Sequence, residues 1–186
     1  MAIAAPWGMS AMGLRAVFLV GFMGSGKNTV GQELARRLAW DFVDLDARIE
    51  AGEGQSIAEI FRRRGEPAFR TAETSALREL TSTLVRDSVV ALGGGTFVAE
   101  TNRDLLRSRS WPSVFLDAPV SELWQRCLQH EAADGGRRPL RNDPEQFAQL
   151  HEQRLPFYRQ AALVVQTSGK DAGAICEEIV RGLQLG

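Results

Sequence analysis

The chain has 186 residues, and its 22 lysine and arginine residues nearly balance 23 aspartate and glutamate residues, for a formal net charge of −1. This length suits one domain with a substantial core, and the balanced charge excludes a global attraction to nucleic acid or to an anionic membrane surface. The longest apolar run, near residues 16 to 23, is too short to span a bilayer. We therefore expect a soluble protein with local anion sites, and neither nucleic acid nor a membrane as a partner.

The chain begins with a segment that predicts no structure of its own. Residues 1–12 carry no charged region and no sustained apolar core, so they do not resemble a signal peptide. We expect a loose extension there and a single domain over residues 13–186. Cys127 and Cys176 lie far apart and lack metal-ligand spacing, which favours two reduced structural thiols in a cytoplasmic protein.

The strongest motif lies at residues 21–29, which read Gly-Phe-Met-Gly-Ser-Gly-Lys-Asn-Thr. The apolar run at 15–20 predicts a buried strand before it, and the amphipathic pattern of 29–38 predicts a helix after it. In a glycine loop between a strand and a helix, backbone N–H groups surround a phosphate and the lysine reaches the outer phosphates. We expect the nucleotide to bind Gly24, Ser25, Gly26, Lys27, Asn28 and Thr29.

The motif departs from its usual pattern at one position. Asn28 stands where serine or threonine normally offers a hydroxyl to Mg²⁺. Thr29 cannot replace it, because one helical step turns the side chain by about 100°. The amide oxygen of Asn28 can ligate Mg²⁺, so we hypothesise a working but altered metal site.

Strands and helices alternate along the rest of the chain. Strands are expected at 42–44, 89–92, 114–117 and 163–165, and helices at 47–51, 56–64, 66–86, 102–107, 120–130, 144–159 and 172–183. Together with the strand at 15–20, this alternation predicts an α/β fold: a three-layer α/β/α arrangement with a five-stranded parallel sheet covered on both faces.

Chemically useful residues follow two of these strands. Asp44 and Asp46 come at the end of one strand, near the phosphate loop if the two strands are neighbours, and Gly93, Gly94 and Gly95 follow another. Ligands of open α/β folds bind at this edge of the sheet, and glycines let a ligand approach the backbone closely. A flexible turn is the alternative for the glycines, and a helix cap is the alternative for Asp46.

A basic segment suggests a moving part. Residues 131–142 are polar, contain glycine and carry several arginines, which favours a mobile flap over about 130–142 that closes on phosphates, with a solvated loop as the alternative. The guanine-reading N-K-x-D motif and the D-x-x-G switch of GTPases are absent from the sequence. A kinase of small metabolites, which must exclude water, is therefore indicated.

The motifs, taken in order, resemble those of the shikimate kinase family. The matching segments are 21–29, 44–46, 69–73, 93–95, 137–140 and 154–159, and the match covers about residues 14 to 184. The resemblance implies phosphoryl transfer from ATP to the 3-hydroxyl of shikimate, in the route to aromatic amino acids. It also implies a monomeric P-loop fold of the nucleoside-monophosphate-kinase type, with a flap and a substrate-binding helical segment at about 45–75.

The resemblance assigns the substrate site. Arg70 and Arg154 match carboxylate-binding arginines, and planar guanidinium groups suit bidentate carboxylate recognition, although for isolated arginines a solvated surface role would be the alternative. Asp46 matches the aspartate that binds the ring hydroxyls and can accept the proton of the attacking one. The glycines at 93–95 match the loop that lies against the substrate.

It also assigns the nucleotide site. Lys27 is expected to bridge the β- and γ-phosphates, and Arg138, carried by the flap, to offset the charge that develops on the transferred group. Arg126 matches an arginine that packs on the adenine face, with an exposed helix arginine as the alternative. The turn at 167–171 is expected to form the other side of the adenine pocket.

For the metal, Asp44 matches the aspartate that holds Mg²⁺ through water, beside Asn28, and Asp117 is the second candidate. Two other functions stay open on the sequence alone. One is a kinase of another hydroxy acid, such as gluconate, although the paired arginines and the triple glycine favour shikimate. The other is a non-catalytic nucleotide-binding homologue, suggested by Asn28.

Overall fold

The computed structural model describes residues 15–134 and 143–185. In chain order the elements are β1 (Ala16–Val20), α1 (Lys27–Leu38), β2 (Asp41–Asp44), α2 (Leu45–Glu53), α3 (Ile57–Thr83), β3 (Ser88–Ala91), the 3₁₀-helix η1 (Thr96–Val98), α4 (Glu100–Ser108), β4 (Ser113–Asp117), α5 (Val120–Asp134), α6 (Pro144–Tyr158), β5 (Leu163–Gln166) and α7 (Ala172–Leu183).

The strands form one parallel sheet of five, in the order β2-β3-β1-β4-β5. The central strand β1 places Leu19 opposite Ala91 of β3 and Val20 opposite Phe115 of β4. The predicted five-stranded parallel sheet is confirmed. Because the chain leaves β1 toward β2 and β3 and later crosses to β4 and β5, a crevice opens at the carboxyl end of β1, where open α/β sheets bind ligands.

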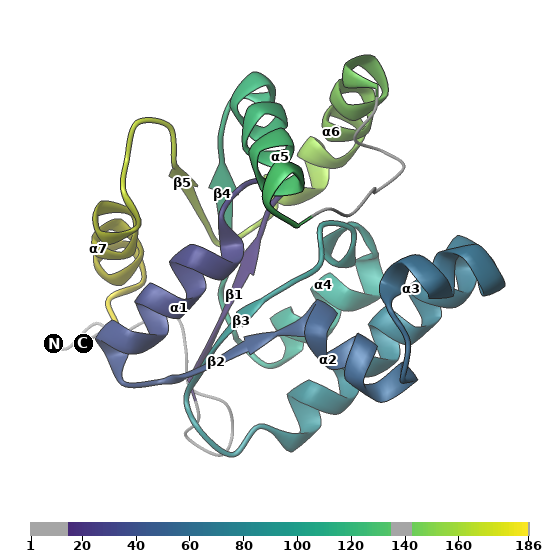
Figure 1. The fold of residues 1–186 in the computed structure, drawn as a ribbon. Helices are drawn as coiled ribbons and strands as arrows, with labels where there is room; N and C mark the ends of the chain where they lie inside the picture. Colours follow the sequence, from purple (N-terminus) through teal and green to yellow (C-terminus); the bar gives the residue numbers. More distant parts are fainter. Residues whose placement is uncertain (1–14, 135–142, 186) are drawn as a thin grey trace, which may run out of the picture.

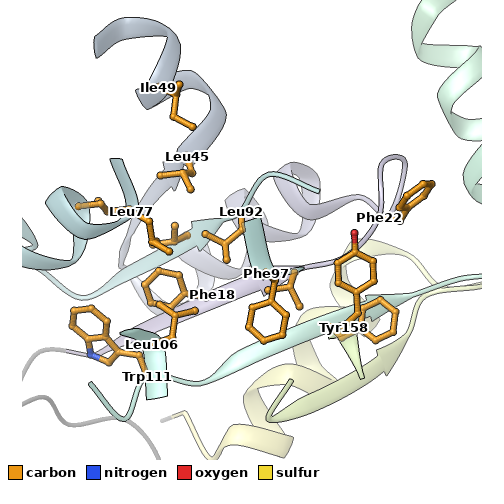
Figure 2. Close-up of a cluster of buried hydrophobic side chains, with 14 of the residues drawn as sticks. Phe18, Phe22, Leu45, Ile49, Leu77, Leu92, Phe97, Leu106, Trp111 and Tyr158 are labelled. Atoms are coloured by element: carbon orange, nitrogen blue, oxygen red, sulfur yellow. The ribbon is translucent and has the colours of Figure 1, made fainter. Parts of the chain in front are cut away.

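Helices cover both faces of the sheet, which confirms the three-layer arrangement (Figure 1). On one face α1 and α7 lie side by side over Val17, Leu19 and Val165. The opposite face holds a larger core that runs from Trp111 and Phe18 to Phe22 and Tyr158 (Figure 2). β1 is buried along its whole length because both sides of the strand face helices.

The boundaries of α2 and α3 differ from the predicted ones for local reasons. α2 begins at Leu45 rather than residue 47, because the Asp44 side chain caps it by accepting from the backbone N–H of Asp46. α3 joins the two helices expected at 56–64 and 66–86, but Gly65, with φ 78 and ψ 172, interrupts its helical backbone. The predicted break is therefore present as a kink, and the helix ends at Thr83.

Several other sequence-based expectations can be placed on the structure. α5 continues to Asp134, so the first residues of the expected flap are helical, while residues 135–142 and the expected extension at 1–12 lie outside the described residues. Cys127 and Cys176 are buried, and neither is in a disulfide. Within the described ranges, every helix is too short or too polar to cross a membrane.

Candidate functional site

The loop between β1 and α1 has the backbone of an anion site. Gly24 and Gly26 adopt φ values of 79 and 85, in the left-handed region that favours glycine, and Gly26 directly precedes α1. A Cβ atom at Gly24 would lie 2.6 Å from the carbonyl oxygen of Leu123 in α5, so the loop packs directly on that helix. The expected phosphate residues therefore lead into a helix N-terminus, whose N–H groups and dipole attract anions.

The side chain of Lys27 lies folded over this loop. Its Nζ donates to the carbonyl oxygens of Gly21 and Phe22, both at 2.9 Å. Burial lowers the pKa of Lys27 to about 8, and the nearby carboxylates of Asp46 and Asp44 oppose that shift. The lysine thus lies within electrostatic range of both acidic residues, and its charge is poorly compensated by the neutral carbonyls it contacts.

Asp44 and Asn28 lie in direct contact. The Nδ2 group of Asn28 donates to Oδ2 of Asp44 at 2.6 Å, while Oδ1 of Asp44 accepts from the backbone N–H of Asp46 at 2.9 Å. The side-chain cap of α2 is therefore Asp44, and the alternative reading of Asp46 as that cap is wrong. The two residues expected to hold the metal are brought together at the head of α1.

This pair suits Mg²⁺ by its chemistry. Carboxylate and amide oxygens are hard ligands, and Mg²⁺ in nucleotide sites commonly takes one or two protein groups, the substrate phosphates and water. In the described part of the chain no group of three or more His, Cys, Asp or Glu side chains could hold a metal by itself. The second candidate, Asp117, accepts from Nε2 of Gln166 at 2.8 Å instead of facing Asn28. The geometry favours Asp44.

The triple-glycine turn after β3 gathers the expected substrate residues. A Cβ atom at Gly93 would lie 2.6 Å from Oδ1 of Asp46, so only glycine allows this approach. The carbonyl oxygen of Gly94 accepts from Nη1 of Arg154 at 3.3 Å. An aspartate from α2 and an arginine from α6 thus meet at one turn.

Arg70 reaches the same turn from α3. Its guanidinium lies so close to Gly95 that a Cβ there would be 2.6 Å from Cζ of Arg70. Nη1 of Arg70 donates to Glu73 at 2.9 Å, and Nη2 donates to Glu66 at 2.9 Å. Although burial alone would lower the pKa of Arg70, these two carboxylates raise it above its ordinary value. The guanidinium stays charged and is fixed in place.

Glu73 is a site residue that the sequence analysis did not assign. It is 1% exposed, and besides Arg70 it accepts from Oγ1 of Thr96, just beyond the glycines, at 2.6 Å. A buried carboxylate paired in this way holds α3 to the glycine turn. Its position three residues after Arg70 on a helix is the signal that could have found it.

Tyr158 was also missed. Its hydroxyl donates to the carbonyl oxygen of Gly94, which therefore accepts from both Tyr158 and Arg154. The tyrosine ring is fully buried and stacks on Phe115 of β4 at 5.2 Å, and burial raises the pKa of Tyr158 to about 12. The hydroxyl remains a neutral donor that fixes the turn from the core side. Its signal is a spacing of one helical turn from Arg154.

The expected nucleoside residues lie on the other side of the phosphate loop. Arg126 is on α5, the helix that packs on Gly24, and its side chain is half-buried. The turn after β5 approaches the same helix, since the Ser168 hydroxyl donates to Glu122 of α5. Arg138 lies outside the described residues.

Comparison with known proteins agrees with this arrangement. A family model described as shikimate kinase matches residues 23–184. The chain is 46% identical to the shikimate kinase of Halorhodospira halophila, with 90% of this chain and 93% of the relative covered, and 42% identical to that of Geobacter metallireducens, with 92% and 93% covered. The shikimate kinase of Acinetobacter baumannii, solved in complex with shikimate, superposes with a TM-score of 0.79 at 36% identity, covering 90% of this chain and 92% of that one.

Proposed function

The chain belongs to the shikimate kinase family and phosphorylates shikimate with ATP, and we propose how its residues divide that work. The observation that supports the proposal best is the glycine turn at 93–95, where Asp46, Arg70 and Arg154 converge beside the phosphate loop. The alternative of a gluconate-like kinase is not favoured by the relatives.

The substrate's carboxylate binds between Arg70 and Arg154. Two guanidinium groups on one turn can hold a carboxylate by paired, charge-assisted hydrogen bonds. Arg70 is held toward that position by the buried Glu73, and Arg154 by the carbonyl of Gly94. The ring then lies over the bare backbone of residues 93–95, a surface that any larger residue would fill.

Asp46 orients the 3-hydroxyl of shikimate toward the terminal phosphate of ATP. In the transfer, a bond forms between that oxygen and the γ-phosphorus, and the bond from the γ-phosphorus to the bridging oxygen breaks. The hydroxyl proton passes to the Asp46 carboxylate. Because the transition state of phosphoryl transfer is loose, orientation contributes more than basicity.

Residues 24–29 bind the phosphates, and Arg126 contacts the adenine face. Lys27 releases the carbonyls of Gly21 and Phe22 and bridges the β- and γ-phosphates, which supply the negative charge that it lacks. Arg138, which lies outside the described residues, adds positive charge at the transferred group.

Asp44 and Asn28 are the residues that would hold Mg²⁺. The bound ion would neutralise phosphate charge and set the position of the nucleotide tail. Asn28 makes this site an altered one, because its amide replaces a hydroxyl and its N–H₂ group already donates to Asp44.

Within one domain that covers residues 13–186, residues 45–75 form the substrate-binding segment. The protein acts as a monomer in the cytoplasm, a location that suits two buried cysteines without a disulfide.

A coupled assay of ADP release tests this function. We expect release that depends on shikimate and is negligible with gluconate or without an acceptor. A second candidate, a nucleotide-binding protein without activity, is suggested by the contact between Asn28 and Asp44. It would bind ADP yet release none from ATP at any Mg²⁺ concentration.

A further inference from the structure

The two sides of the phosphate loop differ in what they can bind, the acceptor substrate on one side and the nucleoside of ATP on the other. In the strand order β2-β3-β1-β4-β5, the residues proposed to bind the acceptor substrate (Asp46, Arg70 and Arg154) meet at the glycine turn after β3, on the β2 and β3 side of the central strand. A nucleotide whose phosphates occupy the loop after β1 must therefore extend its nucleoside toward β4 and β5. That side is formed by α5 and by the turn after β5.

Glu122 connects these two structures. Its Oε2 accepts from Nη2 of Arg126 at 3.2 Å, and its Oε1 accepts from the hydroxyl of Ser168. The first contact lies within α5, and the second spans 46 residues to the turn after β5. One carboxylate therefore fixes the Arg126 guanidinium and the tip of the turn together.

Both partners of Glu122, Arg126 and Ser168, belong to segments that are held in place by other contacts. The backbone N–H and the hydroxyl of Thr167 donate to the carbonyl oxygen of Asp117 at 2.8 and 3.1 Å, so the base of the turn is tied to the end of β4. α5 packs on the phosphate loop at Gly24. At the tip of the turn, Gly169 has a φ of 69, and nothing lies within 4 Å of the position that a Cβ atom would take there. The hydrogen bond from Ser168 to Glu122 connects this tip to α5.

We propose that Glu122 is the positioning residue of the purine nucleoside subsite, holding Arg126 and the Ser168 turn in the arrangement that receives the base. The inference rests on the proposed function, which places the nucleotide at the phosphate loop. A guanidinium bonded along one edge keeps its flat face available for stacking on a base. Fixing it before binding reduces the ordering that the ligand must impose.

The alternative is that Glu122 and Arg126 form an ordinary helix ion pair, four residues apart and partly exposed. Such pairs contribute little to stability, and their loss has no ligand-specific effect. The two views differ in which ligands lose affinity when Glu122 is replaced. A positioning role affects only ligands that carry a nucleoside.

Calorimetric titration separates the two views by comparing ADP with inorganic tripolyphosphate at fixed Mg²⁺, because tripolyphosphate reaches only the phosphate loop. We expect Glu122→Ala to weaken ADP binding roughly tenfold, while tripolyphosphate binding stays within about twofold of the parent. Glu122→Gln, which keeps an acceptor for the serine hydroxyl, should recover part of the ADP affinity. The control is Asp104→Ala, which removes the exposed ion pair with Arg107 on α4 and should change neither ligand.

Kinetics and a double variant complete the test. The KM for ATP should rise in Glu122→Ala, with kcat and the KM for shikimate unchanged, and adding Arg126→Ala should cause little further loss. Equal weakening of ADP and tripolyphosphate, unchanged ADP affinity, or fully additive losses would overturn the proposal. A parent protein that binds ADP as expected but fails to phosphorylate shikimate would refute the proposed function and leave this inference standing.

Discussion

The guanidinium carbon of Arg154 lies over the ring of Phe22, 5.7 Å from its centroid. Phe22 belongs to the phosphate loop, is fully buried and meets Phe147 and His151 of α6 edge-on at 4.9 and 5.3 Å. The helix that carries Arg154, which we propose binds the substrate's carboxylate, is therefore packed directly on the loop proposed to bind the nucleotide's phosphates. In the proposed function, this contact fixes the position of Arg154 relative to the phosphate loop.

Replacing Phe22 should leave the position of Arg154 relative to the phosphate loop less well fixed. We expect Phe22→Leu to raise the KM for shikimate roughly fivefold, because Arg154 loses the aromatic face beneath it. Stability should fall by about 1–2 kcal/mol in urea unfolding, as for core shape changes. Val85→Ala, at a residue that is 83% exposed and lies outside the proposed site, serves as the control and should leave the KM unchanged. An unaltered KM in Phe22→Leu would show that the contact has no role in substrate binding.

The substitution Gly95→Ala should disrupt the proposed carboxylate-binding site at Arg70 without unfolding the protein. The added carbon would lie 2.6 Å from Cζ of Arg70, so the half-exposed arginine must swing away. We expect kcat/KM for shikimate to fall about 100-fold, with little change in melting temperature. Gly52→Ala is the matched control, since nothing lies within 4 Å of its new carbon. It should be neutral or slightly stabilising, and similar losses in both variants would contradict the account.

Two carboxylates that bond Arg70 should differ sharply in importance. The side chain of Glu73 is 2% exposed and also bonds Thr96, whereas that of Glu66 is 60% exposed. We expect Glu73→Gln to cost about 2–3 kcal/mol of stability and to raise the KM for shikimate, because it disrupts a buried charge pair. Glu66→Gln should change stability by less than about 0.5 kcal/mol. Chemical denaturation with steady-state kinetics measures both, and equal effects would refute the assigned difference.

Nucleotide binding should take up a proton above pH 8, where the free protein holds Lys27 partly neutral. Folding lowers the pKa of Lys27 from 10.5 to about 8, so between these values the unfolded chain binds more protons and the stability of the free protein rises with pH. Phosphates restore the charge, and ADP affinity should therefore fall as the pH increases through this window. Calorimetry in two buffers of different ionisation enthalpy measures the uptake. Lys27→Met should abolish it, and equal uptake in that variant would assign the proton elsewhere.

The Asn28 position should control the Mg²⁺ requirement. If its amide oxygen is a ligand, Asn28→Ala loses activity relative to the parent, and Asn28→Ser lowers the Mg²⁺ concentration that gives half-maximal activity. Activity should be measured over a range of Mg²⁺ concentrations. ADP affinity with and without Mg²⁺ gives a second readout that does not depend on turnover. A large rise in maximal activity in the serine variant would identify asparagine as a defect. Parental behaviour in Asn28→Ala would show that this side chain is not a ligand.

The sequence predicted the fold closely, because the sheet and its helices depend on local patterns. The last helix was expected at 172–183 and is observed there, and the break expected between 64 and 66 is the kink at Gly65. The remaining differences lie at helix ends: α5 continues to Asp134, α3 ends at Thr83 and α2 begins early. Asp44 starts α2 early because a carboxylate at a strand end can bond the next N–H groups, which periodicity does not reveal.

The sequence predicted the motif residues of the site, but not the buried residues that hold them in position. The glycine turn and the residues Asp46, Arg70 and Arg154 were expected to act together, and the structure brings them together. The helical spacing of Glu73 from Arg70 and of Tyr158 from Arg154 is a local signal, but it does not encode what these residues contact. Glu73 bonds Thr96 and Tyr158 bonds Gly94, which lie 23 and 64 residues away in the chain. Those contacts follow only from packing.

The most direct test of the account is a crystal structure of the protein soaked with ADP and shikimate. We predict that the shikimate carboxylate lies between the guanidinium groups of Arg70 and Arg154, that its 3-hydroxyl faces Asp46, and that the ADP phosphates occupy the loop at Lys27. A shikimate ring bound away from the two arginines would contradict the central claim.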